Sequence, residues 1–330
     1  MANLRMGLVG CGFMGRMHGN VYRMLDKADL VAATDRSSER LSRYAQEMGC
    51  ESEPSLEALL AREDIDAIDV CLPTYLHKEA TLAAARAGKH VVCEKPMALN
   101  AADAEAMIEA AREAGVRLMI AHCIRFWPEY ALLKQIVDDR RYGRLLSINL
   151  TRYGEFPSWS SENWLADESK AGGGVLDMHI HDTDFIHYLL GDPDSISSWG
   201  TVDERGPGHV FTTMTYGSTV AHLEGGWNLP SHTPFKMAFR AIFERGAAIM
   251  DAGPLTIYEP GKDPVVPEFA KMEAQGGGNI SDLGGYFVEL KDFIDHLEAG
   301  QPTTVVTPQT SRRSLEVALE EIAQIKAKHQ

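Results

Sequence analysis

Fourteen residues near the middle of the chain concentrate side chains that can perform chemistry. The segment AGGGVLDMHIHDTD, residues 171–184, contains three glycines, two histidines and three aspartates. Imidazole and carboxylate groups bind metal ions, transfer protons and orient one another. The segment is therefore compatible with a metal site, with the start of a helix or with a catalytic group. The secondary structure around it distinguishes between these alternatives.

Helical spacing argues against a metal site in the HIH tripeptide. Residues 175–190, VLDMHIHDTDFIHYLL, have the length and the apolar spacing of a helix. On a helix of ~3.6 residues per turn, His179 and His181 lie about 200° apart and cannot share a metal ion. On a strand both rings would point to one face, so a metal-dependent hydrolase is an alternative that metal analysis of the purified protein would test.

The same helix predicts a shared face for Asp177, His181 and Asp184, which are spaced at i, i+4 and i+7. The glycines before them let the helix begin close to another backbone or to a ligand. A carboxylate beside an imidazole is either a structural pair or a catalytic one. These residues by themselves leave that choice open.

Composition limits the partners that such a group can serve. The chain has 330 residues, enough for two domains, and a formal net charge of −15, which disfavours nucleic acid and anionic membranes and favours a small molecule. No stretch approaches the ~20 apolar residues of a membrane span, and the N-terminus lacks the pattern of a signal peptide. The five cysteines show no CxxC spacing, which predicts free thiols and a cytoplasmic location.

The first 123 residues alternate strand-length apolar runs with amphipathic helical patterns. This alternation predicts an α/β fold, a doubly wound parallel sheet with helices on both faces. The expected strands are 5–10, 30–35, 65–73, 90–96 and 116–123, and the expected helices include 13–26, 37–49, 76–87 and 102–114.

The first expected turn carries the glycine pattern GCGFMG. Gly10 would allow a tight turn, Gly12 would let the backbone approach a pyrophosphate, and Gly15 would let the helix pack close to the strand. The pyrophosphate would then lie at the helix N-terminus, beside Phe13 and Met14. A plain glycine-rich turn is the alternative.

The end of the second expected strand carries Asp35 and Arg36. A carboxylate at Asp35 can accept hydrogen bonds from the adenine ribose hydroxyls and would repel a 2′-phosphate, which favours NAD over NADP. Arg36 could stack on adenine or bind a 2′-phosphate, so NADP use is a second option. Asp35 could also simply cap the helix that starts at Ser37 or Ser38.

A second motif lies at residues 73–98, PTYLHKEATLAAARAGKHVVCEKPMA. Its strand ends in Glu94, Lys95 and Pro96, and a lysine at the carboxyl end of a sheet strand faces the crevice where open α/β folds bind ligands. Together with GCGFMG, this stretch resembles the glucose–fructose oxidoreductase, inositol dehydrogenase and rhizopine-catabolism family. The glycines, aspartate and histidine of residues 172–181 are similar to a second signature of that family, so the resemblance covers both halves of the chain.

The resemblance implies roles for residues of both motifs. Lys95 would be catalytic, Glu94 would help to bind the cofactor, and Pro96 would shape the turn, a cis bond being one way to do so. Pro73, Thr74 and His77 would lie along the nicotinamide half of the cofactor, although a solvated helix-start position also fits His77.

Asp177 and His181 would face Lys95 across the cofactor crevice. Oxidising a secondary alcohol needs a hydride acceptor and a base, and His181, with an ordinary pKa near ~6.5, suits the base. Asp177 would orient the imidazole, and Lys95 would stabilise the developing alkoxide.

Residues 124–330 have a different character and predict an α+β domain with an open, mostly antiparallel sheet. The expected helices are 128–139, 175–190, 282–299 and 308–328, with a low-complexity loop at 273–279. The expected strands are 144–155, 196–204, 208–216, 219–227, 235–243, 247–251 and 255–259.

Several further side chains are candidates for contacts to a substrate. Arg125 occupies a position where the family often has an arginine or asparagine beside the active site, and an ion pair between domains is the alternative. Tyr153, Asn163 and His232 could contact a substrate. Trp159, Trp164 and Trp227 could stack on a sugar ring or fill the core.

The sequence thus predicts an NAD-dependent oxidoreductase, with NADP possible, that acts on a secondary alcohol of a cyclic polyol or sugar. Residues 1–123 would bind the dinucleotide, and residues 124–330 would bind the substrate and form a homodimer or homotetramer through the sheet, as family members commonly do. The alternatives are an NADP-linked oxo-sugar reductase, a dihydrodiol dehydrogenase and a non-catalytic dinucleotide-binding regulator.

Overall fold

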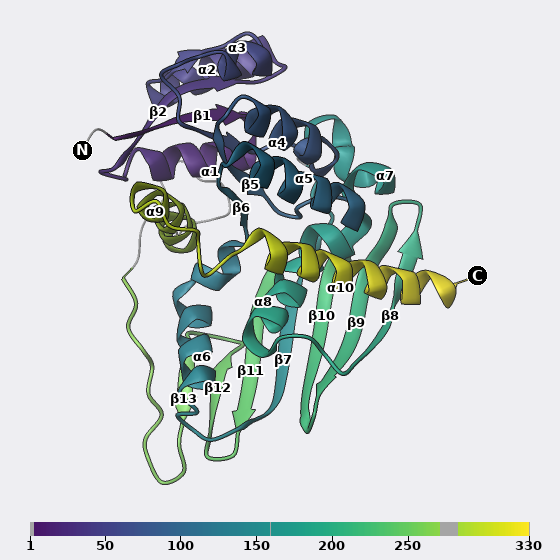
Figure 1. Cartoon of the computed structure of the whole chain (residues 1–330). Helices are drawn as coiled ribbons and strands as arrows, with labels where there is room; N and C mark the ends of the chain where they lie inside the picture. The colour runs from purple at the N-terminus through teal and green to yellow at the C-terminus, as the bar shows by residue number, and fades with distance from the viewer. Residues whose placement is uncertain (1–2, 159, 271–282, 330) are drawn as a thin grey trace. The chain divides into compact units, whose positions relative to one another are not determined.

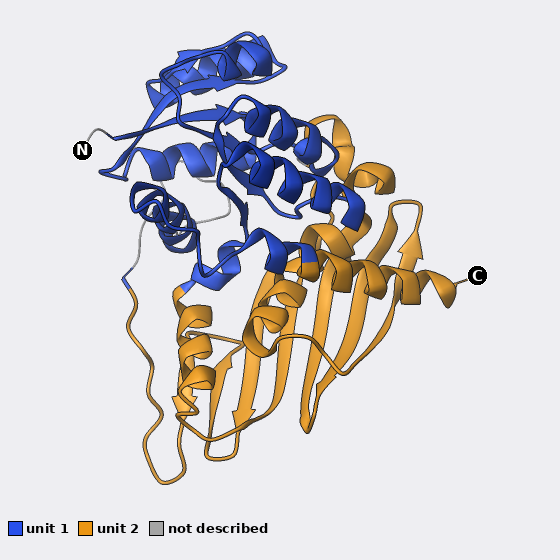
Figure 2. Cartoon of the chain, in the orientation of Figure 1, with its two compact units in different colours: residues 1–127, 270–312 blue, residues 128–269, 313–330 orange. Residues whose placement is uncertain are grey.

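The chain divides into two units, and each unit is built from two separate stretches of sequence. In the computed structural model, which describes residues 3–158, 160–270 and 283–329, unit 1 comprises 1–127 and 270–312, and unit 2 comprises 128–269 and 313–330 (Figure 2). The expected boundary at 123/124 lies close to the first of these borders, whereas the segment 270–312 groups with the first unit and not with the second.

Unit 1 contains a six-stranded, all-parallel sheet in the order β3-β2-β1-β4-β5-β6 (Figure 1). Its strands are β1 (Leu4–Val9), β2 (Ala28–Thr34), β3 (Glu51–Ser52), β4 (Ala67–Val70), β5 (His90–Glu94) and β6 (Leu118–Ala121). The strand order reverses between β1 and β4, which is the place where open α/β sheets bind ligands outside the carboxyl ends of the strands. The predicted doubly wound sheet is confirmed.

The helices of unit 1 begin and end at residues with recognisable capping chemistry. They are α1 (Phe13–Tyr22), α2 (Ser38–Met48), α3 (Leu56–Leu60), α4 (His77–Arg86), α5 (Ala101–Ala114) and α9 (Gly284–Glu298). The Ser37 hydroxyl accepts a hydrogen bond from the Arg40 N–H, and the Asn100 side chain does the same for Asp103. Such N-caps stabilise a helix by about 1 kcal/mol each.

Helix α9 explains why the segment 270–312 groups with unit 1. It packs against α1, where the Tyr286 ring lies 6.2 Å from the His18 ring, and Lys27 forms ion pairs with Asp295 and Glu298 at 2.9 and 2.7 Å. Leu290, Phe293 and Ile294 on the same helix are buried. These contacts join the late helix to the early sheet.

Unit 2 contains a seven-stranded sheet in the order β13-β12-β11-β7-β10-β9-β8. Its strands are β7 (Leu145–Glu155), β8 (Ser195–Asp203), β9 (Gly206–Tyr216), β10 (Thr219–Leu229), β11 (Lys236–Phe243), β12 (Gly246–Met250) and β13 (Thr256–Tyr258). The prediction of a mostly antiparallel sheet is confirmed, and the pairing of β7 with β10 is the parallel exception.

Helices cover one face of this sheet (Figure 1). They are α6 (Pro128–Asp138), the short α7 (Glu168–Ala171), α8 (Ile180–Leu190) and α10 (Pro308–Ala327), of which the last begins in unit 1. Arg152 of β7 points to this face, because its guanidinium pairs with Asp182 of α8 at 3.0 Å and bonds to the Tyr130 hydroxyl of α6. Since side chains alternate along a strand, Tyr153 points to the opposite, uncovered face.

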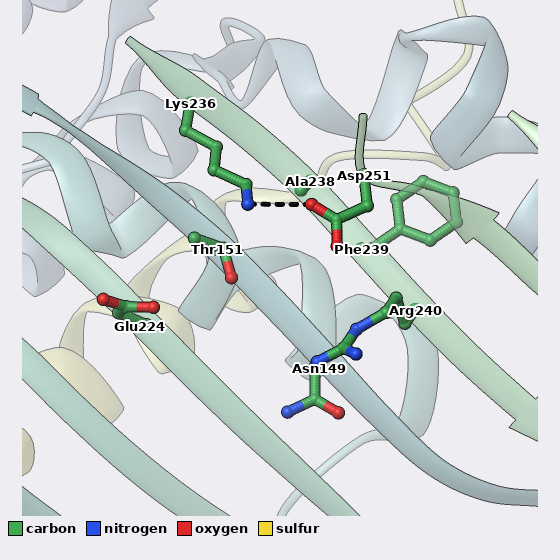
Figure 3. A pocket seen from close by; sticks show the side chains of 8 residues that line it. All are labelled: Asn149, Thr151, Glu224, Lys236, Ala238, Phe239, Arg240 and Asp251. Carbon is green, nitrogen blue, oxygen red and sulfur yellow. Dashed lines mark ion pairs between the residues drawn. The ribbon is translucent and has the colours of Figure 1, made fainter. Parts of the chain in front are cut away.

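The uncovered face carries a mixture of charged and apolar side chains. Lys236 and Asp251 form an ion pair of 2.8 Å beside Thr151, Glu224 and Arg240 (Figure 3). Phe211 lies directly across from Trp199 in the β8–β9 pair, and the two residues are 53% and 60% exposed. Within the described residues, no helix has both the length and the hydropathy of a membrane span. The expected loop at 273–279 lies outside the described residues.

Candidate active-site residues

The glycine turn after β1 has the geometry of a dinucleotide cradle. Gly10 has a φ of +98°, and a Cβ on Gly15 would lie 2.1 Å from the Gly10 carbonyl oxygen, so neither position admits another residue without a shift. A Cβ on Gly12, in contrast, would meet no protein atom within 4 Å. The chain itself therefore gives no packing reason for glycine at position 12.

The N-cap residue of α1 makes no side-chain hydrogen bond to the start of the helix. Gly12 is the N-cap of α1 and supplies no side chain to bond the first N–H groups of the helix, and Phe13 and Met14 form its first turn. Such N–H groups and the positive end of the helix dipole bind phosphate oxygens. The turn and helix start thus fit the pyrophosphate of a dinucleotide.

Asp35 follows β2, and its carboxylate already has several partners. Oδ2 accepts a hydrogen bond from the Cys11 N–H at 2.9 Å, and Oδ1 accepts bonds from the Ser37 N–H at 2.8 Å and from Arg40 Nε at 3.2 Å. Asp35 thereby ties the end of β2 to the glycine turn, which is a structural task in addition to the predicted contact with ribose. Arg36, beside it, is exposed.

Lys95 follows β5, at the same carboxyl edge of the sheet as the glycine turn after β1. It is half-buried, its backbone N–H donates to Glu94 Oε2 at 3.1 Å, and the peptide bond between Lys95 and Pro96 is cis. The structure therefore brings Glu94 and Lys95 to the edge where this class of sheet binds ligands.

His77 holds two neighbouring strand ends together. Its Nδ1 lies 2.8 Å from the Pro96 carbonyl oxygen and its Nε2 lies 2.8 Å from that of Leu72. Burial lowers the pKa of His77, while the two carbonyl oxygens, which can only accept hydrogen bonds, act in the opposite direction. The residue is fully buried and is no solvated helix-start histidine. Pro73 and the buried Thr74 lie in the short turn before it.

The segment 171–184 leads into a helix with an irregular first turn. Residues Val175–His179 form a π-helical turn, and α8 continues from Ile180. Because a π turn contains more residues than an α turn, the i, i+4 relation expected between Asp177 and His181 does not hold in its simple form. Both side chains are half-buried, and Asp177 Oδ2 accepts a hydrogen bond of 2.9 Å from the indole Nε1 of the fully buried Trp227.

Buried polar contacts hold this helix in place. His179 Nε2 lies 3.0 Å from Glu321 Oε1 of α10, and the Thr183 hydroxyl donates to Oε2 of the same carboxylate at 2.9 Å. Asp184 accepts a hydrogen bond from the Ser314 hydroxyl at 2.8 Å and is buried. Asp184 therefore anchors α8 to α10. It has a different environment from Asp177 and His181, with which the sequence predicted a shared helix face.

The two histidines of the HIH tripeptide occupy different environments. His179 is fully buried against Glu321, whereas His181 is half-buried. Across the part of the chain that the structure describes, the group with the spacing of metal ligands is instead His18, Asp69 and Cys71 in unit 1.

The remaining candidates are dispersed. Arg125 is buried and donates from one terminal nitrogen to the Val305 carbonyl at 2.7 Å and to the Thr310 hydroxyl at 3.2 Å, both within unit 1. Tyr153 lies on the uncovered face of the sheet in unit 2, opposite to the face that carries Asp177, so the structure does not bring the two together. Trp227 packs in the core with its ring 5.0 Å from that of Phe156.

Three loop positions complete the set of candidates. Trp164 is half-buried, and Asn163 and His232 are exposed residues with φ values of +52° and +70°. Trp159 lies outside the described residues.

Sequence reasoning missed two buried contacts next to the candidate residues. The indole of Trp227 was weighed as a stacking or core residue, and no signal in the sequence marks it as a donor to Asp177. The buried group of His18 and Asp69 was also missed, although an aspartate inside the apolar run AIDVC was a usable signal.

Comparisons with known proteins agree with this geometry. Residues 4–122 match the model of an oxidoreductase family with an NAD-binding Rossmann fold, and residues 130–249 match the C-terminal domain of the same family. The chain belongs to the GFO/IDH/MocA oxidoreductase family. The resemblance to the glucose–fructose oxidoreductase and inositol dehydrogenase family is thereby confirmed.

Individual relatives in this family carry different names. The chain is 32% identical over 237 residues to a 2,7-anhydro-N-acetylneuraminate hydratase of Escherichia coli, a match that covers 68% of this chain and 63% of the relative. It is 36% identical over 190 residues to a 1,5-anhydro-D-fructose reductase of Ensifer adhaerens, covering 57% of each. The chain thus matches about three fifths of the length of these relatives.

A solved structure matches the whole chain. The UDP-N-acetylglucosamine 3-dehydrogenase of Acidithiobacillus ferrooxidans superimposes with a TM-score of 0.82 at 26% identity, covering 100% of both chains.

Proposed function

We propose that the protein is an NAD(P)-dependent oxidoreductase that interconverts a secondary alcohol and a ketone on a cyclic polyol or sugar. The observation that carries the proposal is Gly12, which has open space at its Cβ position at the uncapped start of α1. Lys95 lies at the same edge of the parallel sheet. Relatives named for anhydro-sugar and sugar-nucleotide substrates support the substrate class.

The cofactor and the chain would divide the chemistry between them. When bound, the nicotinamide accepts or gives the hydride. The glycine turn and the first N–H groups of α1 would hold the pyrophosphate. Pro73, Thr74 and His77, whose ring bridges the carbonyl groups of Leu72 and Pro96, would shape the edge of the sheet next to it. None of these residues needs to ionise for that task.

Lys95, Asp177 and His181 would act on the substrate. His181 takes the hydroxyl proton during oxidation and returns it during reduction, and Lys95 donates a hydrogen bond to the same oxygen as negative charge develops there. Asp177, held by Trp227, orients the imidazole and stabilises its charged form. Arg125, Tyr153 and Trp164 remain candidates for substrate contacts, Tyr153 being the weakest because it lies on the uncovered face.

The first experiment measures reduced-cofactor absorbance with NAD and NADP against a panel of inositols, aldoses, anhydro-sugars and sugar acids. Turnover of one ring substrate that falls at least a hundredfold in both Lys95→Ala and His181→Ala supports the proposal. Turnover that survives in both variants contradicts the assignment of the site. Tight dinucleotide binding without turnover in either direction would favour a regulator that only binds the cofactor.

A second candidate reaction comes from the relative that is named a hydratase. If this chain performs a reaction without net oxidation, cofactor absorbance stays constant while the substrate is consumed. Product analysis by NMR in the same panel detects that outcome.

The preference between cofactors follows from Asp35 and Arg36. A buried carboxylate at the ribose end of the site disfavours a 2′-phosphate, so we infer that NAD is preferred. The exposed Arg36 keeps NADP as a weaker alternative.

The oligomer that we propose is a homodimer or homotetramer formed through the uncovered sheet face of unit 2. Exposed Phe211 and Ile242, which are 53% and 39% accessible, support an interface there. Light scattering after gel filtration tests it, and Phe211→Arg should shift the protein to a smaller species. A cytoplasmic location is likewise a proposal, which cell fractionation tests.

A further inference from the structure

A buried cluster of ionisable groups joins α1 to β4 and to the last residue of β5, directly before Lys95, and the proposed reaction does not use it. His18 of α1 and Asp69 of β4 are completely buried, and Glu94 of β5 is only 5% exposed. His18 Nδ1 lies 2.8 Å from Asp69 Oδ2, and His18 Nε2 lies 3.1 Å from Glu94 Oε1. One imidazole is therefore placed between two buried carboxylates from neighbouring strands.

The cluster has hydrogen-bond geometry and does not need a metal ion. The Tyr22 hydroxyl also donates to Asp69 Oδ2 at 2.8 Å, and the Cys71 thiol donates to Asp69 Oδ1 at 3.3 Å. Two atoms that each bind one metal ion at ~2.1 Å lie farther from each other than the 2.8 Å that separates His18 Nδ1 from Asp69 Oδ2. The distance of 2.8 Å is that of a hydrogen bond.

The charges in the cluster favour a protonated imidazole. Burial alone lowers the pKa of His18, but the adjacent Asp69 carboxylate, which is also hydrogen-bonded to the ring, outweighs it, so the pKa lies well above its usual value. Burial raises the pKa of Tyr22, Cys71 and the nearby Tyr286, so these groups stay neutral. His18 is thus a cation that faces both Asp69 and Glu94.

Glu94 carries the effect of this cation to Lys95. One carboxylate oxygen meets His18, and the other accepts the backbone N–H of Lys95 at 3.1 Å. The contact with His18 is an ion pair without good hydrogen-bond alignment, so attraction between charges holds the carboxylate there. Without the imidazolium, the buried Glu94 carboxylate would lack the charge that holds it and would turn away, and Lys95 would lose its hydrogen bond to Glu94.

We propose that His18 is a positioning residue for the reaction: as an imidazolium between Asp69 and Glu94, it fixes Glu94 and through it the placement of Lys95. This inference rests on the proposed role of Lys95. It adds a residue that contacts neither substrate nor cofactor and acts through Glu94.

The direct test of the charge is NMR of ¹⁵N-histidine-labelled protein between pH 6 and 9. One histidine signal should keep the shifts of a doubly protonated ring throughout this range and should be absent from His18→Gln. A His18 signal that titrates near its ordinary pKa of ~6.5 would overturn the proposal.

The test of the coupling is a double-mutant cycle with Lys95→Met. His18→Gln should lower kcat at least tenfold when Lys95 is present, with less than a threefold change in KM or in the Kd for NAD. In the Lys95→Met background the same substitution should change kcat less than threefold. Equal losses in both backgrounds would show a general structural effect and contradict the proposal.

Two further variants separate positioning from folding. Asp69→Asn keeps the shape of the cluster but removes the anion that holds the imidazolium, so it should reproduce the kcat loss of His18→Gln. Tyr22→Phe removes a neutral donor from the same carboxylate and should leave kcat within threefold. A kcat loss in Tyr22→Phe equal to that in His18→Gln would contradict the proposal.

A readout without turnover distinguishes failure of this inference from failure of the proposed function. The rate at which an amine-acylating reagent labels Lys95, followed by mass spectrometry, should change at least threefold in His18→Gln. If the wild type turns over no substrate but labelling and NMR behave as expected, the positioning role stands and the proposed reaction fails. Unchanged labelling overturns the positioning role whatever the activity.

Discussion

Two glycine-rich segments each precede a helix in this protein, and they differ in what fills the space beside them. In unit 1, a Cβ on Gly12 would meet no atom within 4 Å, and the helix start next to it has no side-chain cap. In unit 2, a Cβ on Gly174 would lie 2.4 Å from the carbonyl oxygen of Gly208 on β9. The first segment has open space next to Gly12, and the second packs at Gly174 against the backbone of β9.

The comparison separates two reasons for glycine that look alike in a sequence. Glycine at position 174 is required by close packing of the helix start on a strand, so this segment serves stability. Glycine at position 12 has no such contact among the described residues, which agrees with the proposal that a ligand approaches the backbone there. The chemistry that we propose for the second segment therefore depends on Asp177 and His181 and not on its glycines.

The largest expected effect is on stability, from Gly174→Ala. The new methyl group would collide with a backbone oxygen that cannot rotate away, so we expect a loss of about 3 kcal/mol or more in the free energy of unfolding. Urea unfolding followed by circular dichroism measures it. A loss below about 1 kcal/mol would mean that the helix start can move away from β9, and the contrast with Gly12 would disappear.

Gly12→Ala should show the opposite pattern. We expect its unfolding free energy to stay within about 0.5 kcal/mol of the wild type, because the methyl group meets no protein atom. The Kd for NAD should rise at least tenfold, which is about 1.4 kcal/mol, because the methyl group occupies space next to the pyrophosphate. Calorimetric titration with NAD measures the Kd. An unchanged Kd would remove the main support for a dinucleotide cradle.

Trp227→Phe tests whether the second segment contributes through its side chains. The substitution keeps most of the buried ring but removes the N–H that donates to Asp177. We expect kcat to fall about fivefold to tenfold, in line with the ~1 kcal/mol of a hydrogen bond, with a smaller change in KM. Phe156→Leu, which changes the packing of the same ring but keeps the donor, is the control. Equal losses in the two variants would assign the effect to packing.

The smallest effect is expected from Arg36→Ala in unit 1. Its guanidinium is exposed, so unfolding free energy should hardly change. The kcat/KM for NADP should fall by about threefold to tenfold, in line with loss of one exposed charge contact, while the value for NAD stays within twofold. Steady-state kinetics with both cofactors measures the ratio. A parallel fall for both would place Arg36 against the adenine and not against a 2′-phosphate.

Much of the fold could be predicted because apolar periodicity is a local signal. The expected strands 5–10 and 90–96 correspond to β1 and β5 to within two residues at either end. The two-residue β3 and the five-residue α3 were not predicted, because so few residues carry no readable period. The parallel pairing of β7 with β10 depends on chain crossings that local patterns do not encode.

The site was predictable only where a motif ties a residue type to a backbone position. Gly12 and Lys95 belong to such motifs, and the structure places them at one edge of one sheet. The π turn that carries Asp177 was predicted as regular helix, since the spacing of apolar residues does not distinguish the two. The ion pair of His18 with Glu94 joins residues far apart in the chain, and the sequence around either residue does not indicate that the two are in contact.

The late position of α9 has a consequence for how the protein is made. This helix covers α1 and carries Tyr286 to within 6.2 Å of His18, yet it leaves the ribosome after the whole first stretch of unit 2. At elongation rates of roughly 5–20 residues per second, the nascent sheet of unit 1 waits on the order of ten seconds for its last helix. During that interval the part of α1 that α9 later covers lacks this contact.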